Sequence, residues 1–384
     1  MQFSQQVEQV QPPPITEVKS WLNGRKFPSD KPLIDLCQAI PNYSPPSELV
    51  EHLKQTLDDP LSFKYSPDEG LPEVRKEVSS WYLRRYQAAP KAEQICLTIG
   101  ASQAFWLAIC SICQAGDEVI VQLPAYFDHP MALQALGIKP VFAPFDPADA
   151  GLPDNHQIEQ LITKRTRAIL LVTPSNPTGA VIPHQQIEQL FKIAQKHNIA
   201  LILDETYNAF IDAPPHKLFG RNDWGENFIH IASFGKTFAL TGLRCGALVA
   251  SKKLIEQALK IQDSMAVCQP RPAQLALEFG CNKLNDWVNE NCRMMQKRHD
   301  QFRNSFISAD HSFELVASGS FFAWIKHPWP QLNSRQAARK LADDANLICL
   351  PGEAFGPGLS TYLRLAFGNI SDQHINSAVE RFRF

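Results

Sequence analysis

Short apolar runs alternate with amphipathic helical patterns through the middle of the chain, from about residue 47 to residue 283. The runs are DEVIVQ (117–122), IKPVFAPF (138–145), RAILLV (167–172), IALILD (199–204), FIHIAS (228–233) and GALVAS (246–251). Strands with so little polar alternation are typical of a sheet that is covered on both faces. We therefore predict an α/β fold, with a mostly parallel sheet and helices on both of its faces.

The pattern changes after residue 283. A long polar-rich helix at 285–306 precedes three strand-like runs: ELVAS (314–318), FFAWI (321–325) and YLRLAF (362–367). This order favours a smaller α+β domain, and the first 45 residues are too short and too often interrupted by proline to form a core alone. We predict a large domain at 46–283 and a small domain formed by 1–45 together with 284–384.

Composition and charge narrow the classes of function. The 384 residues carry a formal net charge of -2 without a long basic run, so we expect small-molecule partners and no nucleic acid. The N-terminus resembles no signal peptide and no apolar run is long enough to span a membrane, which favours the cytoplasm. Nine cysteines, an odd count, indicate reduced thiols. We read the lone CxxC at Cys110 and Cys113 as part of a buried helix face and expect no metal.

Lys236 has the most informative surroundings, because SFGKTFALTGLRCGALVA (233–250) places it among glycines and hydroxyls beside an apolar strand. The GKT triplet also imitates the end of a phosphate-binding nucleotide loop. However, His230 occupies the position of the first glycine of such a loop, and the acidic strand LILDE (201–205) precedes the triplet. A nucleoside triphosphatase is therefore excluded.

Seven segments match, in order, the motifs of one enzyme family. They are KYSPDEGLPEVR (64–75), TIGASQAF (98–105), LPAYFDHP (123–130), TPSNPTGAV (173–181), LILDETY (201–207), the lysine segment (233–250) and YLRLAFG (362–368). From about residue 34 to residue 367 the chain resembles the fold-type-I aminotransferases of class I and II, which use pyridoxal 5'-phosphate (PLP). The resemblance implies ping-pong transfer of an α-amino group from an amino acid to a 2-oxo acid.

The resemblance also implies the roles of the catalytic residues. Lys236 matches the lysine that binds PLP as an imine and moves the α-proton. Asp204 matches the carboxylate that keeps the pyridine nitrogen protonated, so that the ring accepts electrons. Asn176 and Tyr207 match the donors to the phenolic oxygen of PLP.

Further residues match contacts to the phosphate, the ring and the substrate. Those matching phosphate contacts are Ala101, Ser102, Ser233 and Arg244. Tyr126 matches the aromatic residue that stacks on the ring, although Phe127 could take its place. Tyr65 matches a tyrosine that reaches the phosphate of the neighbouring subunit, which implies a homodimer. Arg364 matches the arginine that grips the α-carboxylate, together with Asn176.

The chain departs from the family near its N-terminus. SFGKT is closest to the kynurenine, glutamine and methionine aminotransferase branch, which carries LGQGFP where this chain has LCQAIP (36–41). Ala39 thus replaces a glycine whose backbone touches the substrate, and Ile40 replaces an aromatic residue, so the donor cannot be copied from that branch. Two interpretations of Arg271 stay open: it contacts the distal carboxylate of an acidic amino donor, or it is an ordinary loop arginine. His129 is read either as a pocket residue or as packing.

Other functions use the same cofactor or fold. A C–S lyase or another α/β-eliminating enzyme is the leading alternative, because the bond broken at the α-carbon depends on substrate orientation. A transcription regulator with a PLP-binding domain would need an N-terminal DNA-binding domain, for which about 45 residues leave no room.

Overall fold

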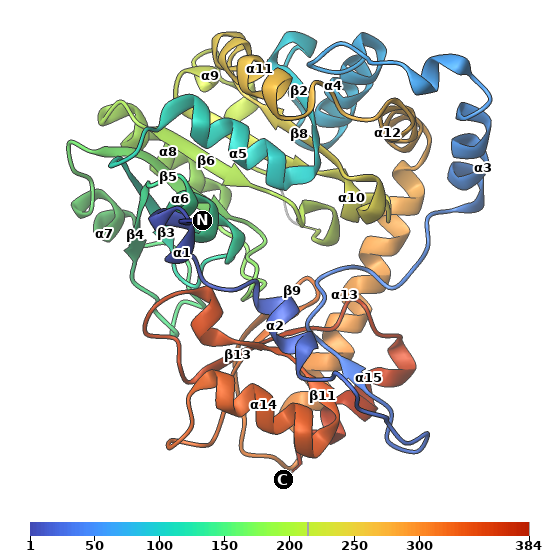
Figure 1. Cartoon of the computed structure of the whole chain (residues 1–384), viewed down its shortest axis with the longest axis vertical. Coiled ribbons are helices and arrows are strands. Elements are labelled where there is room, and N and C mark those ends of the chain that lie inside the picture. The colour runs from blue at the N-terminus through green and yellow to red at the C-terminus, as the bar shows by residue number, and fades with distance from the viewer. Residues whose placement is uncertain (213–214, 384) are drawn as a thin grey trace.

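The six predicted apolar runs all form strands of one seven-stranded sheet, in the upper lobe of Figure 1. The computed structural model describes residues 1–212 and 215–383. The strands of this sheet are β2 (Ile95–Ile99), β3 (Glu118–Gln122), β4 (Lys139–Ala143), β5 (Thr166–Val172), β6 (Ala200–Asp204), β7 (Phe228–Ser233) and β8 (Cys245–Val249). Their order is β2-β8-β7-β6-β5-β3-β4, and only β8 runs antiparallel to its neighbours. The predicted fold class is confirmed, and the sequence pattern missed only the edge strand β2.

Helices cover both faces of this sheet. The helices of the upper lobe are α3 (Ser47–Thr56), α4 (Pro72–Tyr86), α5 (Gly100–Ile112), α6 (Asp128–Ala135), α7 (Asn155–Gln160), α8 (His184–Lys196), α9 (Trp224–Asn227), α10 (Phe234–Thr237), α11 (Lys252–Ala266) and α12 (Arg271–Lys283). Along β6, Leu201 and Leu203 join a core with α4, α8 and α12, whereas Ile202 joins one with α5, α6 and α11. Burial of both faces explains why these strands carry almost no polar side chains.

The lower lobe contains two smaller sheets. Its antiparallel sheet has the order β12 (Leu350–Pro351), β13 (Tyr362–Ala366), β10 (Phe322–Lys326) and β9 (Glu314–Gly319). The second sheet has two strands, β1 (Ile34–Asp35) and β11 (Leu347–Ile348), which pair in parallel and join the N-terminal segment to the lower lobe. The helices that pack along this lobe are α2 (Pro14–Ser20), α13 (Asn285–Ser308), α14 (Ser334–Ala345) and α15 (Asp372–Glu380), whereas α1 (Gln5–Glu8) packs against α6 of the upper lobe. The predicted domain boundaries stay predictions.

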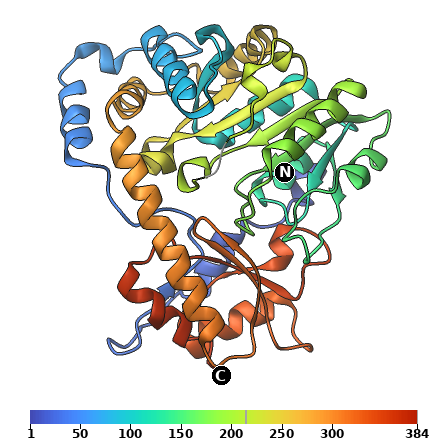
Figure 2. The same ribbon diagram turned by 180° about the vertical axis from the view of Figure 1, so that it is seen from behind.

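Two features connect the lobes. Seen from behind in Figure 2, α13 runs from the upper lobe down the length of the lower one. The turn after β5 also meets the β9–β10 turn backbone to backbone, since a Cβ on Gly179 would lie 2.3 Å from the amide nitrogen of Gly319. The glycine pair therefore lets the lower lobe approach the carboxyl ends of the parallel strands.

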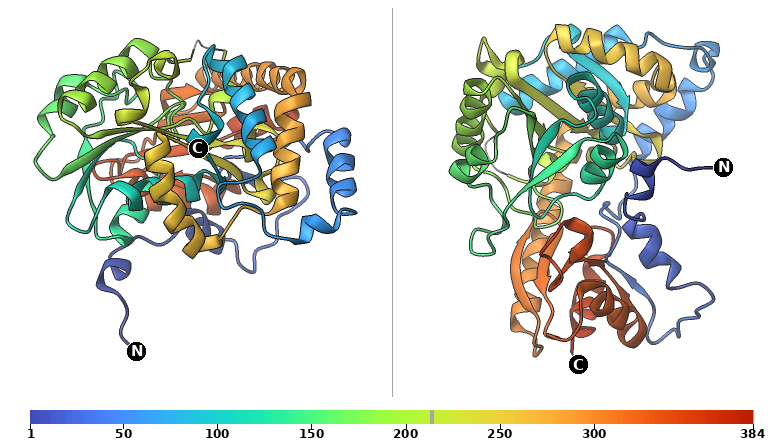
Figure 3. Two further views of the ribbon diagram at one scale, coloured as in Figure 1. Left: turned by 90° about the horizontal axis from the view of Figure 1, so that it is seen from above. Right: turned by 60° about the vertical axis from the view of Figure 1, so that its left-hand side comes forward.

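The chain ends differ in their surroundings. The N-terminal end projects from the body in both panels of Figure 3, and Met1 and Phe3 are exposed. Among the described residues, none of the helices is long and apolar enough to cross a membrane. Cys110 and Cys113 are only half-buried, so the prediction of a buried cysteine pair is wrong: they lie at the end of α5, where the helix leaves the core.

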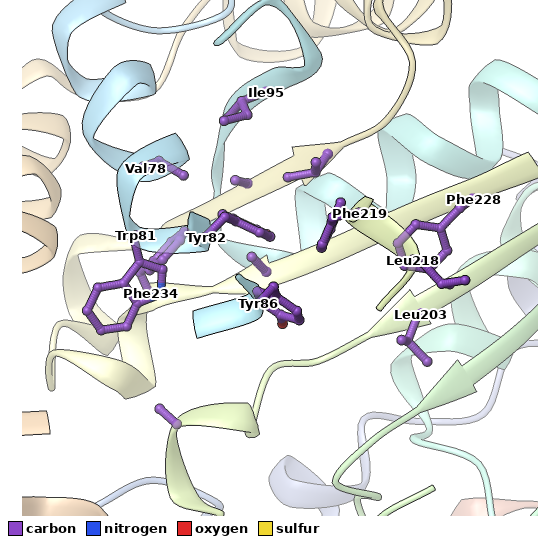
Figure 4. Close-up of a cluster of buried hydrophobic side chains, with 14 of the residues drawn as sticks. Val78, Trp81, Tyr82, Tyr86, Ile95, Leu203, Leu218, Phe219, Phe228 and Phe234 are labelled. Atoms are coloured by element: carbon purple, nitrogen blue, oxygen red, sulfur yellow. The ribbon is translucent and has the colours of Figure 1, made fainter. Parts of the chain in front are cut away.

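Figure 4 shows part of the buried hydrophobic core, including Tyr86 and Phe219. A buried polar cluster borders these two rings, since the centre of the His216 ring lies 5.1 Å from that of Tyr86 and 5.3 Å from that of Phe219. Oε2 of Glu205 accepts hydrogen bonds from Oη of Tyr86 at 2.5 Å and Nε2 of His230 at 2.7 Å. Nε2 of His216 lies 3.3 Å from the same oxygen, without hydrogen-bond geometry. Burial alone would raise the pKa of Glu205, but His216 and His230 hold that pKa well below its usual range. The carboxylate is therefore ionised in the folded chain.

The cluster of Glu205, His216 and His230 has the composition and spacing of a metal site. However, the Leu218 amide donates a hydrogen bond to Nδ1 of His216 at 3.2 Å. A neutral ring then carries its proton on Nε2, the atom that faces Glu205, and has no lone pair there for a metal. We therefore interpret the cluster as a hydrogen-bonded support that links α4 to the ends of β6 and β7.

Replacing Glu205 with glutamine should lower the free energy of unfolding by about 3 kcal/mol at neutral pH. The substitution removes the buried negative charge that accepts hydrogen bonds from Tyr86 and His230. Since the folded-state pKa of Glu205 is lowered, its contribution is complete above the unfolded carboxyl pKa of about 4.3 and is lost in more acidic solution. Urea denaturation against pH measures both effects. The exposed pair Glu380–Arg383 supplies the control, because Glu380→Gln should cost less than about 1 kcal/mol. Equal losses in the two variants would contradict the assignment.

Candidate active site

A cavity at the carboxyl edge of the large sheet collects most of the predicted site residues. Those that line it are Ala101, Ser102, Tyr126, Asn176, Asp204, Tyr207, Ser233, Lys236 and Arg244. Parallel strands deliver them because the loops after β2, β3, β5, β6 and β7 all leave the sheet at one edge. Because β8 runs the other way, its amino end, preceded by Arg244, lies at that edge too.

Lys236 lies in the single turn of α10, directly after the buried strand β7. Its amine is 5.2 Å from the centre of the Tyr207 ring. Burial lowers the pKa of Lys236 to about 8, against the opposing influence of the Asp204 carboxylate. An amine with this pKa has a usable fraction of free base near neutral pH, as a nucleophile or proton carrier requires.

Asp204 ends β6 and is buried. Its Oδ2 lies 3.2 Å from Nε2 of His129, and its Oδ1 accepts from the Thr206 amide at 2.9 Å. Burial would raise the pKa of Asp204, but the contacts with His129 and Thr206 lower it overall. The carboxylate therefore stays ionised. His129 lines the cavity as well, so it both borders the pocket and supports Asp204.

Asn176, Tyr207 and Arg364 form a buried chain of contacts. Nδ2 of Asn176 donates to Oη of Tyr207 at 3.4 Å, and Nη1 of Arg364 donates to Oδ1 of Asn176 at 3.2 Å. Asn176 follows β5 in the upper lobe, whereas Arg364 comes from β13 in the lower lobe. The two lobes thus meet at this amide, even though Arg364 is not among the residues that line the cavity.

Arg364 is 1% exposed, yet no carboxylate among the described residues forms an ion pair with it. Nη2 donates to the Cys37 carbonyl, and the guanidinium lies 5.6 Å from the ring centres of Phe322 and Phe355. Its Nε has no partner. A buried cation with a free donor gains stability when it binds an anion.

Ala39 lies in the segment that passes along the end of β13. Two backbone hydrogen bonds fix this segment, Ala366 N to Leu36 O at 2.8 Å and Asn42 N to Gly368 O at 2.9 Å. Since the Cys37 carbonyl accepts from Arg364, the segment places Ala39 two residues from that contact without bringing it into the cavity lining.

The amino end of α5 forms a cradle with β8. Gly100 has φ +77°, and a Cβ there would lie 2.5 Å from Nη2 of Arg244. A Cβ on Gly246 would lie 2.4 Å from the carbonyl carbon of Gly100. Both glycines are therefore needed for Arg244 to approach the helix start, where Ala101 and Ser102 present their amides. Amides at a helix start, together with an arginine, bind a phosphate.

Several cavity residues were missed by the sequence analysis. They are Phe105, Trp106, Asp128, Val172 and Thr206. Asp128 has the clearest chemistry, since its Oδ2 accepts from Oη of Tyr126 at 2.5 Å. The polar residues of the segment YFDH (126–129) could have signalled it, but their sequence pattern does not say which of them faces the cavity.

Besides Arg364 and Ala39, two more residues considered in the sequence analysis lie outside the cavity lining. Tyr65 is 80% exposed between η1 (Pro60–Phe63) and α4. Arg271 is the first residue of α12, and its Nε is buried without a partner. Neither residue contributes to the cavity of its own chain.

The donor set of the cavity fits PLP. The space between Gly100 and Arg244, which a Cβ on Gly100 would fill, can take the phosphate. The buried, ionised carboxylate of Asp204 is available for the pyridine nitrogen. The Lys236 amine, with its lowered pKa, is available for the aldehyde carbon. The adjacent Asn176 and Tyr207 can both donate to one ring oxygen. Every group that the cofactor requires is thus present at one edge of the sheet.

The chain is similar to several known aminotransferases. It is 27% identical over 360 residues to an aromatic aminotransferase of Arabidopsis thaliana, covering 91% of this chain and 89% of that protein. It is also 27% identical over 360 residues to an aspartate aminotransferase of Pyrococcus abyssi, covering 91% of each. Its structure matches that of Thermus thermophilus aspartate aminotransferase with maleate at a TM-score of 0.90 and 25% identity, over 100% of this chain and 99% of that one.

The family comparison agrees with the cavity. Residues 31–382 match the model of aminotransferase class I and II. The predicted aminotransferase function and PLP cofactor are confirmed, and the eliminating alternative is not favoured. With its fold, its donor set and its relatives in agreement, the chain belongs to the class I and II aminotransferase family and is a PLP-dependent transaminase.

Proposed function

We propose that the transaminase site is centred on Lys236 and Asp204 and moves the amino group between an amino acid and a 2-oxo acid by a ping-pong mechanism. The supporting observation is that an amine of lowered pKa and an ionised carboxylate face the same buried cavity. When bound, PLP supplies an electron sink for the negative charge that develops at the α-carbon of the substrate.

Asp204 and Lys236 have separate tasks in this proposal. The Asp204 carboxylate, supported by His129 and Thr206, holds a proton on the pyridine nitrogen. Lys236 would hold the cofactor at its aldehyde carbon, and its free amine would take the α-proton of the substrate. A pKa near 8 suits this exchange, because the amine can both accept and return a proton near neutral pH.

Substrate orientation falls to Arg364, Asn176 and the segment of Ala39. The buried guanidinium has an unpaired Nε and no carboxylate partner among the described side chains. The α-carboxylate of the substrate supplies the missing charge, with Asn176 beside it. Ala39 lies two residues from Cys37, whose carbonyl accepts from Arg364, so this segment borders the place proposed for the α-carboxylate.

The phosphate is held by Ala101, Ser102, Ser233 and Arg244, and Tyr126 covers the ring. Tyr65 completes this site from the neighbouring subunit of a homodimer. Its 80% exposure in the single chain fits a side chain that acts outside its own subunit. The domain boundaries at residues 46 and 283 and the cytoplasmic location stay predictions.

Lys236→Ala should abolish covalent attachment of PLP, because Lys236 is the one lysine among the described residues that line the cavity. Borohydride reduction of the loaded protein, followed by digestion and mass spectrometry, should show a pyridoxyl group on Lys236 in the natural chain and none in the variant. Transamination should fall by several orders of magnitude. Transamination by the variant, or a pyridoxyl group on another lysine, would contradict the assignment of Lys236.

In the cofactor-free protein, the reaction of Lys236 with trinitrobenzenesulfonate should reach half its maximal rate near pH 8, as the lowered pKa requires. A short lysine peptide in the same tube serves as reference, since its pKa is about 10.4 and its rate keeps rising at higher pH. Peptide mass spectrometry follows the modification of residue 236. Parallel profiles for the protein and the peptide would contradict the lowered pKa.

Mixed dimers test whether Tyr65 acts across the interface. A Tyr65→Phe subunit and a Lys236→Ala subunit should each be impaired as homodimers, the first through weaker binding of the phosphate by about tenfold. A dimer of one subunit of each kind contains one intact site if Tyr65 serves its neighbour, and its activity should approach half that of the natural dimer. Absence of this recovery would place Tyr65 in its own subunit.

A further inference from the structure

Asp128 is an acidic group of the cavity with no task in the proposed site. The other acid, Asp204, is matched by His129 and Thr206 and serves the pyridine nitrogen. Arg244 and Lys236 serve the phosphate and the aldehyde carbon. The carboxylate of Asp128 is therefore available to bind a part of the substrate.

The geometry holds the Asp128 carboxylate in place. Asp128 begins α6, and Oη of Tyr126 donates to its Oδ2 at 2.5 Å. Its Oδ1 accepts no hydrogen bond within the part of the chain that the structure describes. The carboxylate is near enough to the reacting amine to raise the pKa of Lys236, against the larger effect of burial. The negative charge of Asp128 is thus felt at the Lys236 amine, next to the place proposed for the amino donor.

Most charged or polar groups of the cofactor and the substrate can be excluded as partners of Asp128. The phosphate and the α-carboxylate are anions, which a carboxylate repels. The pyridine nitrogen has Asp204, and the α-amino group takes the place of the Lys236 amine. Only the side chain of the amino donor is left to face Asp128.

Aromatic side chains line the cavity that contains Asp128, and they suit a donor side chain with an extended aliphatic stem. Besides Tyr126, which is proposed to cover the cofactor ring, Phe105 and Trp106 line the same cavity. Aromatic faces bind an aliphatic stem through its methylene groups and attract a nearby cation. In contrast, Arg271, which could have met a distal carboxylate, lies at the start of α12 outside the lining of its own chain's cavity.

We propose that Asp128, held by Tyr126, selects amino donors whose side chain ends in a cation and disfavours donors whose side chain ends in a carboxylate. The inference rests on the proposed transaminase site and adds its substrate class. An ion pair or charged hydrogen bond in a partly buried site is worth about tenfold or more in affinity.

Matched donors test the proposal in the loaded enzyme. Single-turnover conversion of bound PLP to its amine form should be at least about tenfold more efficient with L-lysine than with L-norleucine, which lacks the ammonium group. L-glutamate should react less efficiently than L-glutamine. In Asp128→Asn, the lysine preference should fall towards unity and the glutamate deficit should shrink. Asp146→Asn, on an exposed loop where the side chain only caps a turn, should leave both ratios unchanged.

Binding gives a second readout that does not depend on turnover. Calorimetry with the cofactor-free protein should show tighter binding of the stable phosphopyridoxyl-lysine conjugate than of phosphopyridoxyl-norleucine, and Asp128→Asn should remove the difference. A natural chain that prefers norleucine or glutamate overturns the proposal, as does an unchanged lysine preference in Asp128→Asn. Failure of every donor to react and of both conjugates to bind would overturn the transaminase site itself, whereas turnover without charge preference overturns only the role of Asp128.

Discussion

The structure depends on keeping one carboxylate ionised inside a water-poor cavity. Asp204 sits at the end of a strand that is buried on both faces, where an isolated charge is strongly disfavoured. Its contacts with His129 and Thr206 more than offset the burial and lower its pKa. The same burial acts in the opposite direction on Lys236, whose pKa falls. One environment thus prepares an acid group and an amine for different tasks.

Sheet topology explains how distant segments supply this cavity. Parallel strands end at one edge, so β5, β6 and β7 each place a functional loop there. The reversal of β8 brings Arg244 to the same edge, and Gly100 and Gly246 remove the side chains that would block it. The lower lobe contributes Arg364, which reaches Asn176 because Gly179 and Gly319 allow close backbone contact.

Buried polar groups around the cavity form two separate systems. Asp204 with His129 faces the cavity, whereas the adjacent Glu205 turns away to Tyr86 and His230 in the aromatic core. Because successive residues at a strand end point to opposite faces, neighbouring acids can have unrelated tasks. Asp128 lines the same cavity as Asp204, but its hydrogen-bond partner is Tyr126 rather than His129.

Local apolar runs were enough to predict the fold class and six of the seven strands of the large sheet. Short motifs singled out Lys236, Asp204 and Asn176, which line the cavity, and Arg364, which contacts Asn176. The edge strand β2 was not predicted, because its short apolar run (95–99) continues directly into the apolar helix α5. Only the tertiary structure decided that His129 supports Asp204, that Asp128 faces the cavity and that Glu205 meets His216 and His230. These contacts join side chains from different loops, and their geometry follows from the packing of the sheet and the lobes rather than from spacing along the chain.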